Sequence, residues 1–134
     1  MTVLVDDQTL AALLRGDLAW PEDDVFTTGL WYLRLCQAVV RSAGGALSGP
    51  LLSLPEDQRL RAVGAVLDLP DRVGMLHWRI LVPTIARQAD NIGRGLNLLS
   101  REALAAATFL QAPVRMAPGN ENRLLGEALR RQSG

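Results

Sequence analysis

The stretch TVLVDDQTLAALLRG, residues 2–16, decides the fold class of this chain. Its first four residues are β-branched or aliphatic, which predicts a short strand that is apolar on both faces, as in a parallel sheet. Asp6 and Asp7 end this strand, and leucines at helical spacing then predict a helix over 8–15 that Gly16 closes. A strand, an acidic turn and a helix in this order are typical of an α/β protein.

The rest of the chain continues this alternation within a length typical of one domain, so we expect a single domain over residues 1–134. The predicted architecture is α/β, with a small parallel sheet flanked by helices in a three-layer α/β/α sandwich. Further strands are predicted at 73–77 and 113–116, loops at 17–24 and 48–50, and helices from Thr27 or Thr28 to about 43, from about 53 to 69, and over 83–93, 101–111 and 120–131.

Composition excludes several classes of protein. The chain has 14 basic residues, all of them Arg, against 14 acidic residues, which excludes a strongly basic nucleic-acid-binding module. Cys36 and His77 are the only residues of their types, so an internal disulfide and a His-rich zinc site are excluded. The acidic N-terminus does not resemble a signal peptide, and no apolar run approaches the ~20 residues that cross a bilayer. We therefore expect a cytoplasmic protein without a membrane partner.

Three carboxylates are candidates for a metal site. Asp6 and Asp7 lie at the exit of the first strand, and Glu102 begins the helix that precedes the last strand. Ligands of open parallel sheets bind beyond the carboxyl ends of the strands, where carboxylates can hold Mg²⁺ or Mn²⁺. A metal-bound water would then hydrolyse a phosphodiester. Each acid also has a structural alternative: Asp6 as a turn or cap residue, Asp7 as a helix cap, and Glu102 as a first-turn acid that complements the helix dipole.

Three segments of the chain resemble PIN-domain proteins. The first is Val3-Leu4-Val5-Asp6 with the following Leu10-Ala11-Ala12-Leu13-Leu14. The second is Val25-Phe26-Thr27-Thr28-Gly29-Leu30, which leads into an apolar helix, and the third runs from Leu98 to Val114. Together they cover nearly the whole chain in the element order of that family. The resemblance implies a PIN-like fold.

PIN-domain proteins include the toxins of bacterial VapBC toxin–antitoxin pairs, which are small metal-dependent ribonucleases held inactive by an antitoxin peptide. The resemblance implies that Asp6 matches the first acid of the family's active site and Glu102 the third. Arg34 stands where the family has its second acid, and Met116-Ala117-Pro118 stands in place of its fourth. Two of four acidic positions therefore keep a carboxylate.

An arginine at the second position opposes metal binding. Two unit charges about 4 Å apart interact by roughly 4 kcal/mol at an effective dielectric of 20, which here is a repulsion between Arg34 and a metal ion. The Arg34 guanidinium would instead pair with Asp6 or Glu102. Polar residues that could compensate for the missing acids are Asp7, Asp90, Asn120 and Glu121.

These residues support two main functional hypotheses. The favoured one is a PIN-like protein of toxin–antitoxin type that is catalytically impaired, needs no cofactor and acts by binding a protein or RNA. The alternative is an active ribonuclease in which Asp6 and Glu102 hold Mg²⁺ or Mn²⁺ with one helper acid, while Arg34 or Arg115 grips the RNA phosphate. A third hypothesis, outside the family, is a plain α/β domain of a larger assembly, with Asp6 and Glu102 far apart.

The expected partner is an antitoxin-like protein or a second copy of the chain, with RNA as a further ligand. Trp31 and Leu35 share one face of a predicted helix. Such a face packs either in the core or against a partner, because aromatic residues often anchor interfaces.

Overall fold

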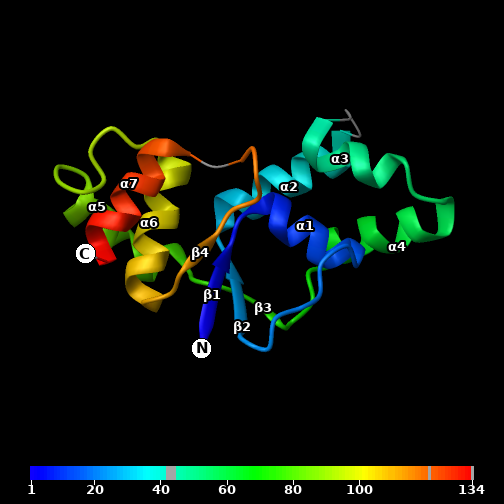
Figure 1. Ribbon diagram of the computed structural model, residues 1–134, viewed down its shortest axis with the longest axis horizontal. Coiled ribbons are helices and arrows are strands. Elements are labelled where there is room, and N and C mark those ends of the chain that lie inside the picture. Colours follow the sequence, from blue (N-terminus) through cyan, green and yellow to red (C-terminus); the bar gives the residue numbers. More distant parts are fainter. Residues whose placement is uncertain (42–44, 121, 134) are drawn as a thin grey trace.

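The computed structural model describes residues 1–41, 45–120 and 122–133. Within this part of the chain, four parallel strands form one sheet in the order β3-β2-β1-β4. Helices cover both of its faces, which confirms the predicted three-layer α/β architecture (Figure 1). The elements are β1 (Thr2–Val5), α1 (Asp7–Arg15), β2 (Asp24–Thr27), α2 (Gly29–Arg41), α3 (Gly45–Leu52), α4 (Glu56–Leu67), β3 (Val73–Met75), α5 (Trp78–Gln88), α6 (Leu98–Leu110), β4 (Val114–Arg115) and α7 (Arg123–Ser133).

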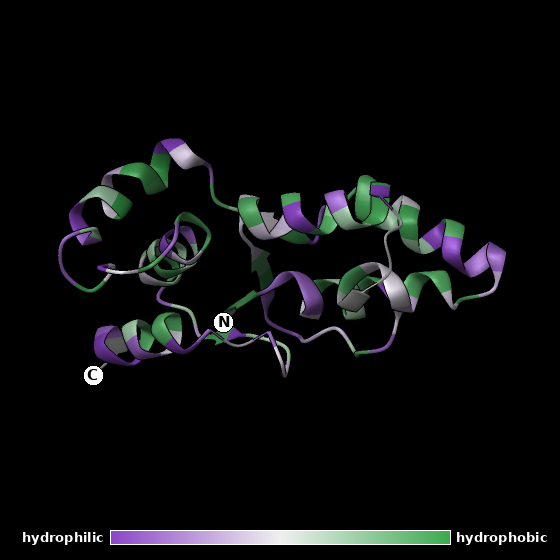
Figure 2. Cartoon of the chain, turned by 90° about the horizontal axis from the view of Figure 1, so that it is seen from above, coloured by the Kyte–Doolittle hydropathy of each residue, from purple (hydrophilic) through white to green (hydrophobic). Residues whose placement is uncertain are grey.

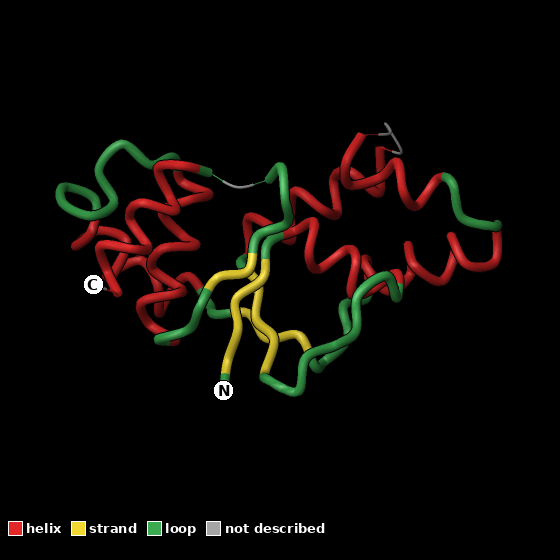
Figure 3. The backbone as a smooth tube through the Cα atoms, in the orientation of Figure 1, coloured by secondary structure: helices red, strands yellow, loops and turns green. Residues whose placement is uncertain are grey.

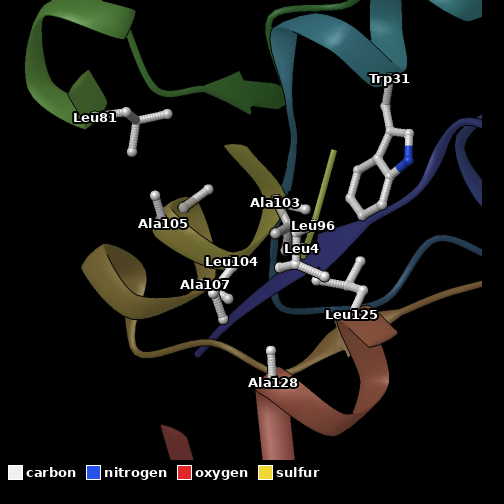
Figure 4. Packing of buried hydrophobic residues seen from close by; sticks show 11 residues of the cluster. Leu4, Trp31, Leu81, Leu96, Ala103, Leu104, Ala105, Ala107, Leu125 and Ala128 are labelled. Atoms are coloured by element: carbon white, nitrogen blue, oxygen red, sulfur yellow. The ribbon is translucent and has the colours of Figure 1, made fainter. Parts of the chain in front are cut away.

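The two faces of the sheet are buried in separate hydrophobic clusters. Because side chains alternate along a strand, Leu4 and Val5 of β1 point to opposite faces. Leu4 packs with residues of α5, α6 and α7, whereas Val5 packs with residues of α1, α2, α3 and α4. Figure 1 shows these two groups of helices on opposite sides of the sheet, and Figure 4 shows the cluster around Leu4. Figure 2 shows that the helices carry both hydrophobic and hydrophilic residues, as expected for helices that cover a core.

Helix α6 is the most deeply buried helix of the described chain over its central turns. Its residues Ala103–Ala107 are all buried, and four of these five side chains are methyl groups. Small side chains allow the backbone of α6 to approach α5, α7 and β1 closely. This close packing fixes Glu102, the residue immediately before the buried run.

Two elements differ from the sequence-based predictions. The segment around Val25 is a central strand, β2, that pairs with both β1 and β3, whereas we predicted only three strands. Residues 48–50, predicted as a loop, belong to helix α3. The N-terminal cap of α2 was predicted correctly, because the Thr28 hydroxyl accepts a hydrogen bond from the Trp31 amide at 3.1 Å.

Three helix starts also differ from prediction. Helix α5 begins at Trp78 and includes Pro83 in its interior, where we predicted a start. Helix α6 begins at Leu98, because the Asn97 side chain accepts from the Ser100 amide and caps it. Helix α7 begins at Arg123 rather than after Asn120. None of the described helices has the length and apolarity of a membrane-spanning segment.

Candidate functional site

The candidate site lies at the carboxyl edge of the sheet, where the strand order reverses. Strand β1 has β2 on one side and β4 on the other, so the chain leaves β1 in one direction and later returns on its other side. In open α/β sheets, ligands bind in the crevice at such a switch point. Figure 3 shows the strands running side by side toward this edge, where Asp6 and Asp7 directly follow β1.

Asp6 is completely buried and acts as a structural cap. Its Oδ1 accepts a hydrogen bond from the Thr9 amide at 2.9 Å, which makes Asp6 the N-cap of α1. Its Oδ2 accepts from the Ala117 amide at 3.1 Å and from Asn120 Nδ2 at 2.5 Å. The carboxylate therefore ties the start of α1 to the segment that follows β4.

Asp7 is also completely buried and forms an ion pair with Arg34 of α2. The Arg34 Nε donates to Asp7 Oδ2 and its Nη2 donates to Asp7 Oδ1 at 3.1 Å, so both carboxylate oxygens are engaged by one guanidinium. Asp7 Oδ1 also accepts from the Gln8 amide at 2.9 Å and from Asn120 Nδ2 at 3.0 Å. The hydrogen bonds to Asp7 raise the pKa of Arg34 above its ordinary value, against the opposing effect of burial, with the charges of Asp7 and Asp6 adding to the rise.

This arrangement corrects three expectations from the sequence. Asp6, rather than Asp7, caps the first helix. Arg34 pairs with Asp7 and not with Asp6 or Glu102, because α2 presents its guanidinium to the start of α1. Asn120, with which the last predicted helix begins, lies outside α7; its Nδ2 bridges the two aspartates and its Oδ1 accepts from Arg34 Nη2 at 3.4 Å.

Glu102 is completely buried and caps a neighbouring helix rather than its own. Its oxygens accept from the Gly29 amide at 3.2 Å and the Leu30 amide at 2.8 Å, at the N-terminus of α2. Its Oε2 also accepts from Trp78 Nε1 at 2.5 Å. The carboxylate thus faces the positive end of the α2 dipole and holds α2, α5 and α6 together.

A side chain at position 29 would crowd this carboxylate. A Cβ added to Gly29 would lie 3.3 Å from Glu102 Oε2 and 3.7 Å from Trp78 Nε1. The absence of a side chain at Gly29 therefore gives Glu102 room for its close approach to the start of α2. Sequence analysis did not single out Trp78 or Gly29; the signal that could have pointed to Trp78 is its position directly after the strand predicted at 73–77.

The acidic residues at this edge of the sheet accept hydrogen bonds from within the chain. Asp6 and Glu102 share no hydrogen-bond partner, and within residues 1–41, 45–120 and 122–133 no three Asp, Glu, His or Cys side chains are grouped so that they could hold a metal. The oxygens of Asp6, Asp7 and Glu102 accept hydrogen bonds from donors of this chain. A metal bound to the Asp7 carboxylate would lie close to one of these donors that is itself a cation, the Arg34 guanidinium.

Asp90, another predicted helper, lies at the far end of α5 from the site. Asp90 is exposed and follows the C-terminal end of α5, whereas Trp78 at the opposite end of that helix contacts Glu102. At a rise of about 1.5 Å per residue, the length of α5 between these two ends is roughly 15 Å. Glu121 lies outside the described residues.

Asp6 and Asp7, with Arg34 and Asn120, form what we call the acidic cluster. Arg115 of β4 lines a cavity of about 310 Å³ beside this cluster. The cavity lies between α1 and residues 115–118, and its walls include Thr9 and Ala117, whose amides hold Asp6. Arg34 is separate from it and keeps 44% of its side chain exposed, so both predicted phosphate contacts reach solvent at this edge.

The predicted face of Trp31 and Leu35 lies in the core. Trp31 is 2% exposed and Leu35 is fully buried, each in one of the two hydrophobic clusters. Neither side chain is available to a partner at the surface of this chain, so the core-packing alternative holds and the interface hypothesis is corrected. Cys36 is half-buried and packs against the same cluster as Leu35.

Comparison with known proteins gave no relative: neither the models of known protein families nor the curated proteins searched match this chain.

Proposed function

We propose that this chain is a PIN-like protein of toxin–antitoxin type that does not catalyse metal-dependent RNA cleavage and acts by binding. The observation that carries the proposal is the ion pair between the buried carboxylate of Asp7 and the partly exposed guanidinium of Arg34. Asn120 extends the pair by bridging Asp7 and Asp6. The carboxylates of the cluster therefore accept hydrogen bonds from the Arg34 guanidinium and the Asn120 side-chain amide.

Electrostatics argues against exchanging this internal cation for a metal ion. A guanidinium about 4 Å from a divalent ion would repel it by roughly 4 kcal/mol per unit of charge at an effective dielectric of 20. Moving Arg34 away would leave the fully buried Asp7 without its charged partner, which costs stability even though Arg34 itself is partly exposed. The geometry therefore favours a stable, metal-free cluster that joins α1, α2 and the segment after β4.

A groove lined by five apolar side chains together with Ser48 and Arg59 supports binding to a protein. It has a volume of about 290 Å³, lies between α2, α3 and α4, and is lined by Val39, Leu51, Leu52, Leu60 and Val63 among others. Leu52 and Leu60 are exposed at its rim. Exposed apolar side chains around a groove suit an amphipathic segment, so an antitoxin-like protein or a second copy of the chain is the proposed occupant.

RNA cleavage tests the catalytic part of the proposal. The purified protein is incubated with RNA in Mn²⁺, beside the Asp6→Asn variant and with excess chelator. Asp6→Asn keeps an Oδ1 acceptor for the Thr9 amide, so it removes the charge with less damage to the fold than Asp6→Ala. We expect the same background in all three samples. Cleavage that is lost both in Asp6→Asn and with chelator contradicts the proposal and supports the active-ribonuclease alternative.

Sedimentation equilibrium tests the groove as a self-association surface. Leu60→Asp places a charge at its rim, and Leu67→Asp is a matched control, because Leu67 is an exposed leucine of α4 outside the groove. A dimer that is lost only in Leu60→Asp identifies the second copy as the occupant. A monomeric wild type excludes the second copy and leaves the antitoxin-like protein.

A further inference from the structure

The cavity between α1 and residues 115–118 combines positive charge with an apolar wall. Arg15 and Arg115 both line it, together with the hydrogen-bonding side chains of Gln8 and Thr9. Ala12, Leu18 and Met116 supply apolar surface. Its volume of about 310 Å³ is at the lower end of the range for small-ligand sites. A ligand with one anionic group and a small planar or apolar part fits this description.

Arg115 supplies a second guanidinium to this cavity. In parallel strands, paired residues point to the same face, and Arg115 pairs with Val5, which packs against the α1 side of the sheet. The side chain is exposed, and its guanidinium has no ion pair within the described residues. A guanidinium without a carboxylate partner is suited to bidentate binding of a phosphate.

Arg15, the other arginine of the cavity, forms an ion pair with Asp17. Its Nε donates to Asp17 Oδ2 at 2.9 Å, with 11% of the Arg15 side chain and 58% of the Asp17 side chain exposed. The lining of the cavity contains the guanidinium groups of Arg15 and Arg115 and the carboxylate of Asp17, so the lining carries a net positive charge. Asp17 thus competes with any anionic ligand for Arg15.

The position of the cavity agrees with its chemistry. It opens beside the switch point between β1 and β4, where ligands of open α/β sheets bind. Asp6 stands behind the cavity wall, and its carboxylate is bonded to the amides of two lining residues, Thr9 and Ala117. The same contacts that satisfy the acidic cluster therefore fix the geometry of the cavity.

We propose that this cavity binds the phosphate group of a nucleotide, with Arg115 as its main contact and Ala12, Leu18 and Met116 against the nucleoside. This inference rests on the proposed binding function, and it specifies how the chain would bind RNA. The phosphate belongs either to a free mononucleotide or to a nucleotide of a single-stranded RNA, and the experiment separates the two sources.

The test follows the backbone amide signals of Thr9, Ala12 and Ala117 by NMR during titration. The probes are inorganic phosphate, uridine, uridine 5′-monophosphate and a twelve-residue oligouridine. We expect saturable shifts of these amides with every probe that carries phosphate and none with uridine at equal concentration. Tighter binding of the oligonucleotide than of the mononucleotide at these amides identifies RNA as the source, and equal or weaker binding identifies the free nucleotide.

Three variants assign the binding to the cavity. Arg115→Ala should weaken binding of the mononucleotide by about tenfold or more, because hydrogen bonds to charged groups are strong. Asp17→Asn should tighten binding by about two- to fivefold, because it releases Arg15 from a surface ion pair. Arg79→Ala is the matched control, since Arg79 is an exposed arginine of α5 without an ion pair within the described residues.

The proposal is overturned if no phosphate-bearing probe shifts these amides, if uridine binds as well as its monophosphate, or if Arg115→Ala binds as tightly as the wild type. RNA that shifts other amides only would overturn this site and leave the proposed binding function intact. Metal-dependent cleavage of RNA would contradict the proposed function. The amide shifts would still show whether the cavity binds a nucleotide phosphate.

Discussion

Removing Arg34 is the most informative perturbation of the acidic cluster. Arg34 donates to both oxygens of Asp7, which is completely buried, while 44% of the Arg34 side chain is exposed. Arg34→Met keeps most of the length and the apolar stem of the side chain and removes its charge and its donors. Asp7 would keep hydrogen bonds from the Gln8 amide and from Asn120. The variant therefore isolates the contribution of the guanidinium.

The expected loss of stability follows from the exposure of the two partners. Breaking a fully buried ion pair costs about 3–5 kcal/mol, and an exposed pair is worth about 0–1 kcal/mol. The pair between Arg34 and Asp7 is buried on the carboxylate side only. After this discount for solvent screening, we expect Arg34→Met to lower the free energy of unfolding by about 1.5–3 kcal/mol.

Urea denaturation of four proteins measures this loss in a double-mutant cycle. The proteins are the wild type, Arg34→Met, Asp7→Asn and the double variant. We expect Arg34→Met to cost less than about 0.5 kcal/mol when Asp7 is already replaced by Asn. Arg41→Met, an exposed arginine of the same helix, is the control and should leave stability nearly unchanged. A coupling energy near zero between Arg34 and Asp7 would refute the reasoning.

Three further predictions concern Glu102, Leu35 and Tyr32. Glu102→Ala leaves the Trp78 indole and two amides of α2 without their acceptor, so thermal denaturation should show a loss of about 3 kcal/mol or more; near-wild-type stability would contradict the capping role. Leu35→Ala should cost about 2–5 kcal/mol in urea denaturation, as expected in a core, whereas an interface residue would leave the monomer's stability unchanged. Burial, with a hydrogen bond to Cys36, raises the pKa of Tyr32 to about 12, so the stability that this group contributes is complete below its usual pKa near 10 and is lost as the pH rises toward 12. Tyr32 is the only tyrosine, so absorbance at 295 nm follows its ionisation directly, and a midpoint near 10 would contradict this pKa.

The fold class could be predicted from local sequence patterns. The strand before Asp6 and the helix closed by Gly16 were predicted correctly, because their apolar spacing and their end residues agree. Strand β2 was missed, since only Asp24–Thr27 form it and its last residue, Thr27, also suits a helix start. Helix α3 was missed because its glycines and Pro50 have low helix propensity, which tertiary packing against α1, α2 and α4 outweighs.

The members of the acidic site could be predicted from the sequence, but not their pairing. Asp6, Asp7 and Asn120 meet because parallel strands bring their carboxyl ends to one edge of the sheet. The partner of Arg34 depends on the rotation of α2 against α1, which is set by packing over the whole interface. Likewise, Glu102 caps a helix that is 72 residues away in the chain from its own position, and local spacing carries no signal of such a contact.

Binding of Mn²⁺ to the wild-type protein, measured by isothermal titration calorimetry beside Asp6→Asn, tests most directly whether the acidic cluster is satisfied by the chain's own donors. The account predicts no saturable heat at micromolar Mn²⁺ in either protein, because Arg34 and Asn120 occupy the carboxylate oxygens that a metal would need. A single site of micromolar affinity that is present in the wild type and absent from Asp6→Asn would contradict the account.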